Sequence, residues 1–259
     1  GQTAPIQNLV TAVENTNINV RALVASPVST GEASLSRDEK EMGVTLVDIG
    51  GGATTVSVYQ QGSLWAAAVL PLGGHQFTTD LAVALNTPYD TAEEVKLRHG
   101  QASMDTIDDE NVEIQAFGDR RTVRVERRVI SRYLLDRAEE LFRLVGLKVK
   151  GFGFPAMPPA GIVLTGGGAN LPGIERVARR ILGTPVRIAG PIGVDGLPEG
   201  MLDPAYVASA GVLLWGTRHL ASLDSVRKEE RRLNKTSGYS QNNTGPLSWL
   251  RERVRKVAL

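Results

Sequence analysis

The sequence Leu46-Val47-Asp48-Ile49-Gly50-Gly51-Gly52-Ala53-Thr54 decides the fold, because a buried strand runs directly into a glycine triplet. Glycine has no Cβ, so the backbone amides of such a turn can approach an anion closely. The pattern recurs at Val163-Leu164-Thr165-Gly166-Gly167-Gly168, where a following helix is expected to favour negative charge at its amino end. One glycine turn alone is equally consistent with an ordinary tight turn, whereas two at strand ends predict a phosphate site. In this interpretation Asp48 orients a metal-bound water and Thr54 donates to a phosphate.

The segments around these turns alternate between strand-like and helix-like patterns. Expected strands are 44–49, 54–59, 63–70, 161–164 and 186–188, together with a strand-like run at 20–25. Expected helices are 5–16, a second ending near 36, 77–85, one starting at 91, 129–144, 172–182 and 204–220. Residues 37–40 are expected to form a solvated turn. This order is that of an α/β protein.

Composition excludes several classes of function. A chain of 259 residues with 42% hydrophobic content can bury a core, and its net charge of +1 gives no general attraction to nucleic acid. With no cysteine and only the scattered His75, His99 and His219, neither disulfides nor a histidine metal cluster are expected, which suits a reducing cytoplasm. No apolar run reaches the roughly 18 residues of a membrane span, and the start resembles no signal peptide. The chain is therefore expected to be a soluble fragment whose true beginning is missing.

Other nucleotide motifs do not fit. The sequence contains no G-x-x-x-x-G-K-[ST], and no G-x-G-x-x-G at the head of a β-α unit with a suitably placed acid. Between the two glycine turns, Glu93 and Lys96 share a helix face at i, i+3, where they are suited to a ribose hydroxyl and a base edge. A solvated ion pair explains the same spacing equally well.

Several strings resemble the actin-like ATPases, and within them the FtsA family. The similar segments are Glu41–Gly52 (second phosphate loop), Leu70–His75 with Thr78 and Asp80, Asn86–Gly100 (nucleoside-contacting helix), Ala160–Gly168 (adenosine loop) and Pro204–Gly211 (connecting helix). The resemblance implies an α/β, actin-like ATPase (RNase H-like) fold, with the second half complete, the first half largely missing and a small inserted α+β subdomain. The implied parts are 1–36 closing the first half, 37–96 with 155–224 forming the second, the insert 97–154, a linker 225–246 and a helix 247–259.

The resemblance implies ATP and Mg²⁺ as cofactors. The implied nucleotide-binding residues are Asp48, Gly50, Gly51, Gly52, Thr54, Gly73, Gly74, Glu93, Lys96, Gly166, Gly167 and Gly168, with Asp48 toward the metal. Two departures matter for catalysis: Ala53-Thr54-Thr55 replaces the family's Thr-Thr-Asp, and Ser26 stands where related ATPases place Glu or Gln. Serine is a poor base, so nucleotide is expected to act as a structural ligand or assembly switch with slow hydrolysis at best. Because the first phosphate loop is absent, these residues are expected to bind ATP weakly or not at all.

The insert corresponds, by resemblance, to the subdomain on which FtsA receives the carboxy-terminal peptide of FtsZ. Its basic residues are Arg120, Arg121, Arg127, Arg128 and Arg132. Arginine can grip carboxylates in bidentate fashion, so an acidic peptide suits this surface. For any one arginine, ordinary solubility is the simpler explanation.

The last residues form an amphipathic pattern that stands without the resemblance. The expected membrane residues are Leu247, Trp249, Leu250, Arg251, Arg253, Val254, Arg255, Lys256 and Val257. An apolar stripe with basic flanks and a border tryptophan is typical of a helix lying in the membrane interface. The alternative is a helix that packs back on the domain or on a partner, which the polar linker 225–246 disfavours.

The combined expectation is a cell-division scaffold at the cytoplasmic face of the membrane. It binds ATP, assembles into actin-like filaments, and tethers FtsZ to an anionic membrane through its terminal helix, beside other division proteins and without nucleic acid. The alternative is an actin-superfold ATPase or sugar kinase with a protein-docking tail, since fold alone does not fix function.

Overall fold

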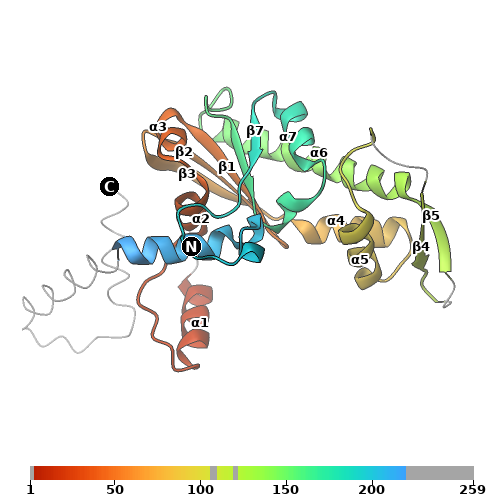
Figure 1. Ribbon diagram of the computed structural model, residues 1–259, viewed down its shortest axis with the longest axis horizontal. Helices are drawn as coiled ribbons and strands as arrows, with labels where there is room; N and C mark the ends of the chain where they lie inside the picture. Colours follow the sequence, from red (N-terminus) through yellow and green to blue (C-terminus); the bar gives the residue numbers. More distant parts are fainter. Residues whose placement is uncertain (1–2, 106–109, 119–121, 220–259) are drawn as a thin grey trace, which may run out of the picture. The chain divides into compact units, whose positions relative to one another are not determined.

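The computed structural model describes residues 3–105, 110–118 and 122–219 (Figure 1). Residues up to Trp215 form one compact unit, and the chain from Gly216 onward forms a second, of which only the helical residues 216–219 are described. The expected linker 225–246 and helix 247–259 therefore lie outside the described residues, as do Arg120 and Arg121. No helix in the described ranges is long and apolar enough to cross a membrane.

A five-stranded mixed sheet is the centre of the first unit, with strand order β3-β2-β1-β6-β7 (Figure 1). Strands β1 (Val44–Ile49), β2 (Thr54–Gln60) and β3 (Ser63–Leu70) form an antiparallel meander, as the sequence predicts. Strands β6 (Ile162–Thr165) and β7 (Val186–Ile188) continue the sheet in parallel with β1. The β1–β6 and β6–β7 pairs are therefore parallel, and the carboxyl ends of β1 and β6 lie at the same edge of the sheet.

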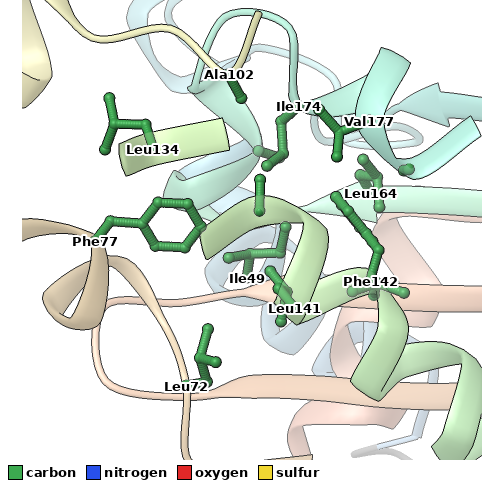
Figure 2. Packing of buried hydrophobic residues seen from close by; sticks show 14 of the residues in the cluster. Ile49, Leu72, Phe77, Ala102, Leu134, Leu141, Phe142, Leu164, Ile174 and Val177 are labelled. Carbon is green, nitrogen blue, oxygen red and sulfur yellow. The ribbon is translucent and has the colours of Figure 1, made fainter. Parts of the chain in front are cut away.

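One face of the sheet carries the main core (Figure 2). Successive strand residues point to opposite faces, so Ile49 and Leu164 point into this core while their neighbours point away. The helices that cover it are α4 (Gly74–Ala84), α5 (Tyr89–His99), α6 (Arg127–Gly151) and α7 (Ile174–Leu182). Helix α6 buries a stripe three to four residues apart, at Ile130, Leu134, Ala138, Leu141, Phe142, Val145 and Val149. This stripe confirms the amphipathic helix expected from 129, which extends one turn or more beyond 144.

The opposite face is covered by α2 (Ser26–Ser34), whose Leu35 end packs with Val44, Leu46 and Val163. The helix over residues 207–219 crosses α2 so closely that a Cβ on Gly211 would lie 1.8 Å from the Ser29 carbonyl oxygen. Glycine at this position therefore permits direct contact between the two helix backbones. The molecule is thus an α/β protein with helices on both faces of the sheet.

A two-stranded hairpin, β4 (Asn111–Gln115) and β5 (Thr122–Glu126), lies beside α5 (Figure 1). Its Val112 and Ile114 join the same core as the sheet. Arg137 of α6 pairs with both carboxylate oxygens of Asp80 on α4 at 2.5 and 2.8 Å, which ties these helices together. Helix α6, which makes up much of the expected insert, contributes to the main core, so the core does not divide at residues 97 and 154. These boundaries of an inserted subdomain stay a prediction.

Three sequence expectations are wrong in detail. Residues 20–25 lie between α1 (Thr3–Glu14) and α2 without strand structure, because in the described residues no strand lies beside them to complete a ladder. Residues 37–40 begin α3 (Arg37–Met42) rather than a turn, since Ser36 and Glu39 form a reciprocal capping box at 3.2 and 2.8 Å. The helix expected at 204–220 begins as a single 3₁₀ turn, Pro204–Tyr206.

Candidate functional site

The two glycine turns lie side by side at one edge of the sheet. Strands β1 and β6 are parallel neighbours, and Asp48 is paired in register with Thr165. The turn at Gly50–Gly52 and the turn at Gly166–Gly168 therefore leave adjacent strands at equivalent points. Ligands of open α/β sheets bind beyond the carboxyl ends of the strands, so this edge is the candidate functional site.

The first turn presents free backbone donors. The Gly50 amide closes the turn by donating to the Ala53 carbonyl at 2.9 Å. Gly51 and Gly52 are exposed, and across the described part of the chain their amides donate to no protein acceptor. Exposed, unengaged amides on a glycine turn are suited to binding an anion.

Thr54 does not take the role that the sequence suggests. Its side chain is fully buried, and its hydroxyl donates to the Leu72 carbonyl at 2.7 Å. A buried hydroxyl whose proton is already engaged cannot also donate to a phosphate without rearrangement. Thr54 therefore holds the turn against the segment that enters α4, and its expected contact with a phosphate is corrected.

Gly73 and Gly74 bring α4 onto the first turn. The amides of Gly74 and His75 donate to the carbonyls of Gly50 and Gly51 at 2.9 and 2.7 Å. A Cβ on Gly73 would lie 2.6 Å from the Gly50 oxygen and 2.7 Å from the Ala53 nitrogen. The structure thus assigns Gly73 a packing role, because any side chain there would separate α4 from the turn.

Asp48 lies between the two turns. A Cβ on Gly166 would lie 2.4 Å from Asp48 Oδ1, so the second turn passes directly over this carboxylate. Burial raises the pKa of Asp48, and a hydrogen bond with the Ser26 side chain at the start of α2 opposes that rise. A half-buried carboxylate beside both glycine turns is a suitable ligand for a cation.

The second turn is shaped by glycine at two positions. Gly166 has φ +82°, a conformation that disfavours other residues, and a Cβ on Gly168 would lie 2.3 Å from Ile49 Cγ2. The turn continues as a single 3₁₀ turn, Gly167–Asn170, and α7 begins only at Ile174 after Gly173 at φ +85°. The expected helix from 172 is therefore displaced, and its amino end does not follow the glycines directly.

Glu93 and Lys96 form a polar cluster on the α4–α5 side of the site. Lys96 Nζ lies 2.7 Å from Glu93 Oε2, 2.8 Å from Thr78 Oγ1 and 3.2 Å from the Gly74 carbonyl. Thr78 also donates to Glu93. Burial would raise the pKa of Glu93, but the hydrogen bonds from Lys96 and Thr78 and the lysine charge together lower it. Because only 12% of the Lys96 side chain is exposed, the pair is not the solvated surface pair of the alternative interpretation.

Three contacts of the site were not predicted from the sequence. His75 is exposed beside the first turn, where a Cβ on Gly51 would lie 3.5 Å from its Nε2, and its Nδ1 is 2.6 Å from the Tyr89 hydroxyl. Thr78 and Ser26 contact Glu93 and Asp48 as described above. Each of these residues carried a signal through the family resemblance: Thr78 and His75 lie in the segment 70–80, and Ser26 stands where related ATPases place Glu or Gln.

The basic residues of the insert differ in their surroundings. Arg127 is only 24% exposed, donates to the His99 carbonyl at 3.1 Å and pairs with Glu110 at 3.4 Å. Arg128 is exposed, and Arg132 is 66% exposed beside Asp136 at 3.5 Å. Arg127 is therefore held by contacts within the fold. Arg128 and Arg132 lie one helical turn apart on the surface.

The residues at the sheet edge suit a magnesium ion that a phosphate helps to hold. Within the described ranges no three acidic or histidine side chains gather into a metal site of their own. Mg²⁺ commonly binds through one or two carboxylates together with substrate phosphates and water. Asp48, beside two glycine turns, fits that donor set.

Comparison with known proteins identifies the family. The family model for "Cell division protein FtsA" matches residues 45–211, which include both glycine turns. FtsA of Pseudomonas aeruginosa is 32% identical over 96% of this chain, and FtsA of Escherichia coli is 34% identical over 95%. The chain spans only 58% and 60% of the lengths of those two proteins.

The fold is also found among solved structures. MreB5 of Spiroplasma citri, in a crystal structure bound to ADP, has a TM-score of 0.69 to this chain at 16% identity, covering 86% of this chain and 68% of MreB5. At that identity the likeness shows the fold alone, which is the actin-like fold that the sequence implies. With a family model covering well over half of its residues, the chain belongs to the FtsA family of actin-like cell-division proteins.

Proposed function

We propose that this chain is the nucleotide-binding and membrane-anchoring part of a cell-division scaffold that tethers FtsZ filaments to the cytoplasmic face of the cell membrane. The observation that carries the proposal is the register pairing of Asp48 with Thr165, which sets two glycine turns side by side over one carboxylate. Membership in the FtsA family supports a scaffold over the alternative of a sugar kinase.

ATP is the proposed ligand of the sheet edge. The exposed amides of Gly51 and Gly52 are suited to phosphate oxygens, and Asp48 is suited to Mg²⁺ held between carboxylate and phosphate. In the Glu93–Lys96–Thr78 cluster a carboxylate, an ammonium and a hydroxyl lie within hydrogen-bond distance of one another. A ribose hydroxyl and a base edge can replace some of the hydrogen bonds that these three side chains make with each other. The bound Mg²⁺ would supply charge neutralisation for the phosphates.

Nucleotide is proposed to act as an assembly switch rather than as a rapidly consumed substrate. The Ser26 side chain forms a hydrogen bond with the Asp48 carboxyl, and a serine hydroxyl is a weak general base. Glu93, the carboxylate of the polar cluster on the α4–α5 side of the site, is already paired with Lys96. Neither Ser26 nor Glu93 is therefore well suited to activate a water. In a protein that also carries the first phosphate loop, Ser26→Gln, which adds a longer polar side chain, is expected to raise ATP hydrolysis more than ATP binding.

Membrane attachment is proposed for residues 247–259, whose sequence combines an apolar stripe with basic flanks. Each basic residue near an anionic surface adds about 1 kcal/mol of attraction. Filament assembly then multiplies these weak contacts into firm attachment.

Co-sedimentation with vesicles that contain anionic lipid tests the anchor. Truncation after Pro246, and the double substitution Trp249→Glu with Leu250→Glu, are both expected to release the protein into the supernatant. The matched control adds the same two charges in the expected linker, as Asn242→Glu with Asn243→Glu, and is expected to bind. Retention of the truncated chain on the vesicles would contradict the proposal, as would failure of the unmodified chain to bind at low salt.

A further inference from the structure

We propose that the groove between the carboxyl-terminal half of α6 and the end of α7 is a docking site for a short acidic peptide with apolar anchors, contributed by a partner protein. This inference goes beyond the proposed function, because the groove lies away from both the glycine turns and the exposed arginines Arg128 and Arg132. Its volume of about 560 Å³ lies within the range of ligand-binding clefts, about 300–1,000 Å³.

The walls of the groove come from α6, from α7 and from the segment that follows α6. Arg143, Leu147 and Lys150 lie on one face of α6 at i, i+4 and i+7. Met157 contributes apolar surface from the segment after α6, and Ile181 and Leu182 contribute it from α7. Leu147 is 63% exposed, so an apolar side chain at the groove is left uncovered by the fold.

Close helix packing determines where the groove begins. A Cβ on Gly146 would lie 3.1 Å from Leu182 Cδ2 and 3.9 Å from Met157 Cε. The two helices therefore approach closely at Gly146, and the hollow lies where Leu147 and Lys150 continue beyond that contact. The hollow is thus bounded by the side chains of Leu182 and Met157, which pack against α6 at Gly146.

The charge of the groove selects an acidic occupant. Arg143 and Arg180 share one carboxylate, Glu139, at 2.5 and 2.7 Å, so this cluster keeps a net positive charge. Lys150 makes no ion pair with any described residue, and the groove lining contains no acidic side chain. A carboxylate brought to Lys150 or Arg143 therefore gains attraction without displacing an existing partner of Lys150.

The occupant is not this chain's own carboxyl-terminal segment. Residues 220–259 contain nine basic and four acidic residues, a net charge of +5, which the groove repels. A flat bilayer is also a poor match, because apolar lining lies inside a hollow between helices. Arg143 and Lys150 are seven residues apart, or about 10 Å along a helix, which sets the separation of the two acidic groups in the peptide.

This surface is separate from the proposed FtsZ site. Arg132 and Lys150 are 18 residues apart on one helix, which corresponds to about 27 Å. Two peptides can therefore occupy α6 at the same time, one near each end. Failure of either site leaves the other proposal intact.

The test uses a panel of short labelled peptides, each with two leucines or phenylalanines and two acidic residues at successive spacings. The chain has no native cysteine, so an environment-sensitive dye on Leu147→Cys reports occupation of the groove directly. We expect at least one peptide to change the dye signal saturably, and Lys150→Glu to weaken its binding by about tenfold, because reversal replaces attraction with repulsion.

The matched control is Lys148→Glu, which makes the same charge change two residues away on an exposed position outside the groove. Equal weakening by Lys148→Glu and Lys150→Glu would overturn the proposal, since it would show general electrostatic attraction. Absence of saturable binding across the whole panel would also overturn it. So would a loss of binding to anionic vesicles in Lys150→Glu with peptide binding unchanged, because the groove would then serve a lipid surface.

Discussion

Asp48 and Thr165 face each other across neighbouring parallel strands, and this one register pair places both glycine turns at the same edge of the sheet. Because β1 and β6 end together, Gly166 passes directly over the Asp48 carboxylate. The site is therefore a product of strand pairing between segments more than 100 residues apart in the chain. Changes at either turn are expected to act on the carboxylate between them.

Gly166→Ala is expected to destabilise the fold by about 2 kcal/mol. A left-handed backbone costs a residue with a Cβ about 1–2 kcal/mol, and the added Cβ would meet Asp48 Oδ1 at 2.4 Å. Urea unfolding measures the change. The neighbouring Gly167→Ala is the control, because its Cβ would meet only Ala205 Cβ at 3.8 Å and should change stability by no more than about 0.5 kcal/mol. Equal losses in both variants would contradict this account of the turn.

Asp48→Asn is expected to stabilise the ligand-free protein. Burial raises the pKa of Asp48, so the stability that this carboxyl contributes is present at low pH and is lost as pH rises through its folded pKa. Asparagine carries no charge and avoids that loss. The difference in melting temperature between variant and parent should therefore grow from acid to neutral pH, as thermal unfolding at several pH values will measure. A parent that is more stable than the variant at neutral pH would contradict the burial argument.

Lys96→Met is expected to lower the free energy of unfolding by about 1 kcal/mol at neutral pH. The effect is smaller than that of losing a fully buried hydrogen bond between charged groups, because the Glu93 side chain is 35% exposed. The pKa of Glu93 is lowered, so its contribution to stability is present above its unfolded pKa and is lost as pH falls through its folded pKa. The difference in the free energy of unfolding between parent and variant should therefore disappear at low pH. Arg98→Met is the control, since Arg98 and its partner Glu94 are 70% and 57% exposed and should contribute little. A gap that persists unchanged at low pH would assign the effect of Lys96 to packing alone.

Local signals predicted much of the fold. The strands at 44–49, 54–59 and 63–70 could be predicted because each is a short apolar or alternating run with glycine close to its ends, and the structure extends the second by one residue to Gln60. The run at 20–25 has a similar composition but is not a strand, because a strand requires a partner and none of the described residues supplies one. The helix at 37–42 was missed although Ser36 and Glu39 are spaced as a capping box, a signal present in the sequence.

The candidate site could be predicted only in part. The Glu93–Lys96 pair follows from helix periodicity, which is local. The contact of Ser26 with Asp48 and that of His75 with Tyr89 depend on which elements pack together, and no local pattern encodes them. Thr54 shows the opposite error, because its position beside the glycines suggested phosphate binding while the packing of Leu72 engages its hydroxyl.

Arg128→Glu combined with Arg132→Glu is expected to weaken binding of the carboxy-terminal FtsZ peptide by about tenfold if the exposed end of α6 receives it, since an acidic peptide would meet two reversed charges. Fluorescence polarisation with the labelled peptide measures the affinity. Arg127 is excluded from the test because its contacts with His99 and Glu110 belong to the fold, and Arg127→Glu should lower stability instead. Arg98→Glu, an exposed reversal on α5, serves as the charge control. Unchanged affinity in the double variant, with the control also unchanged, would place the FtsZ site elsewhere on the molecule.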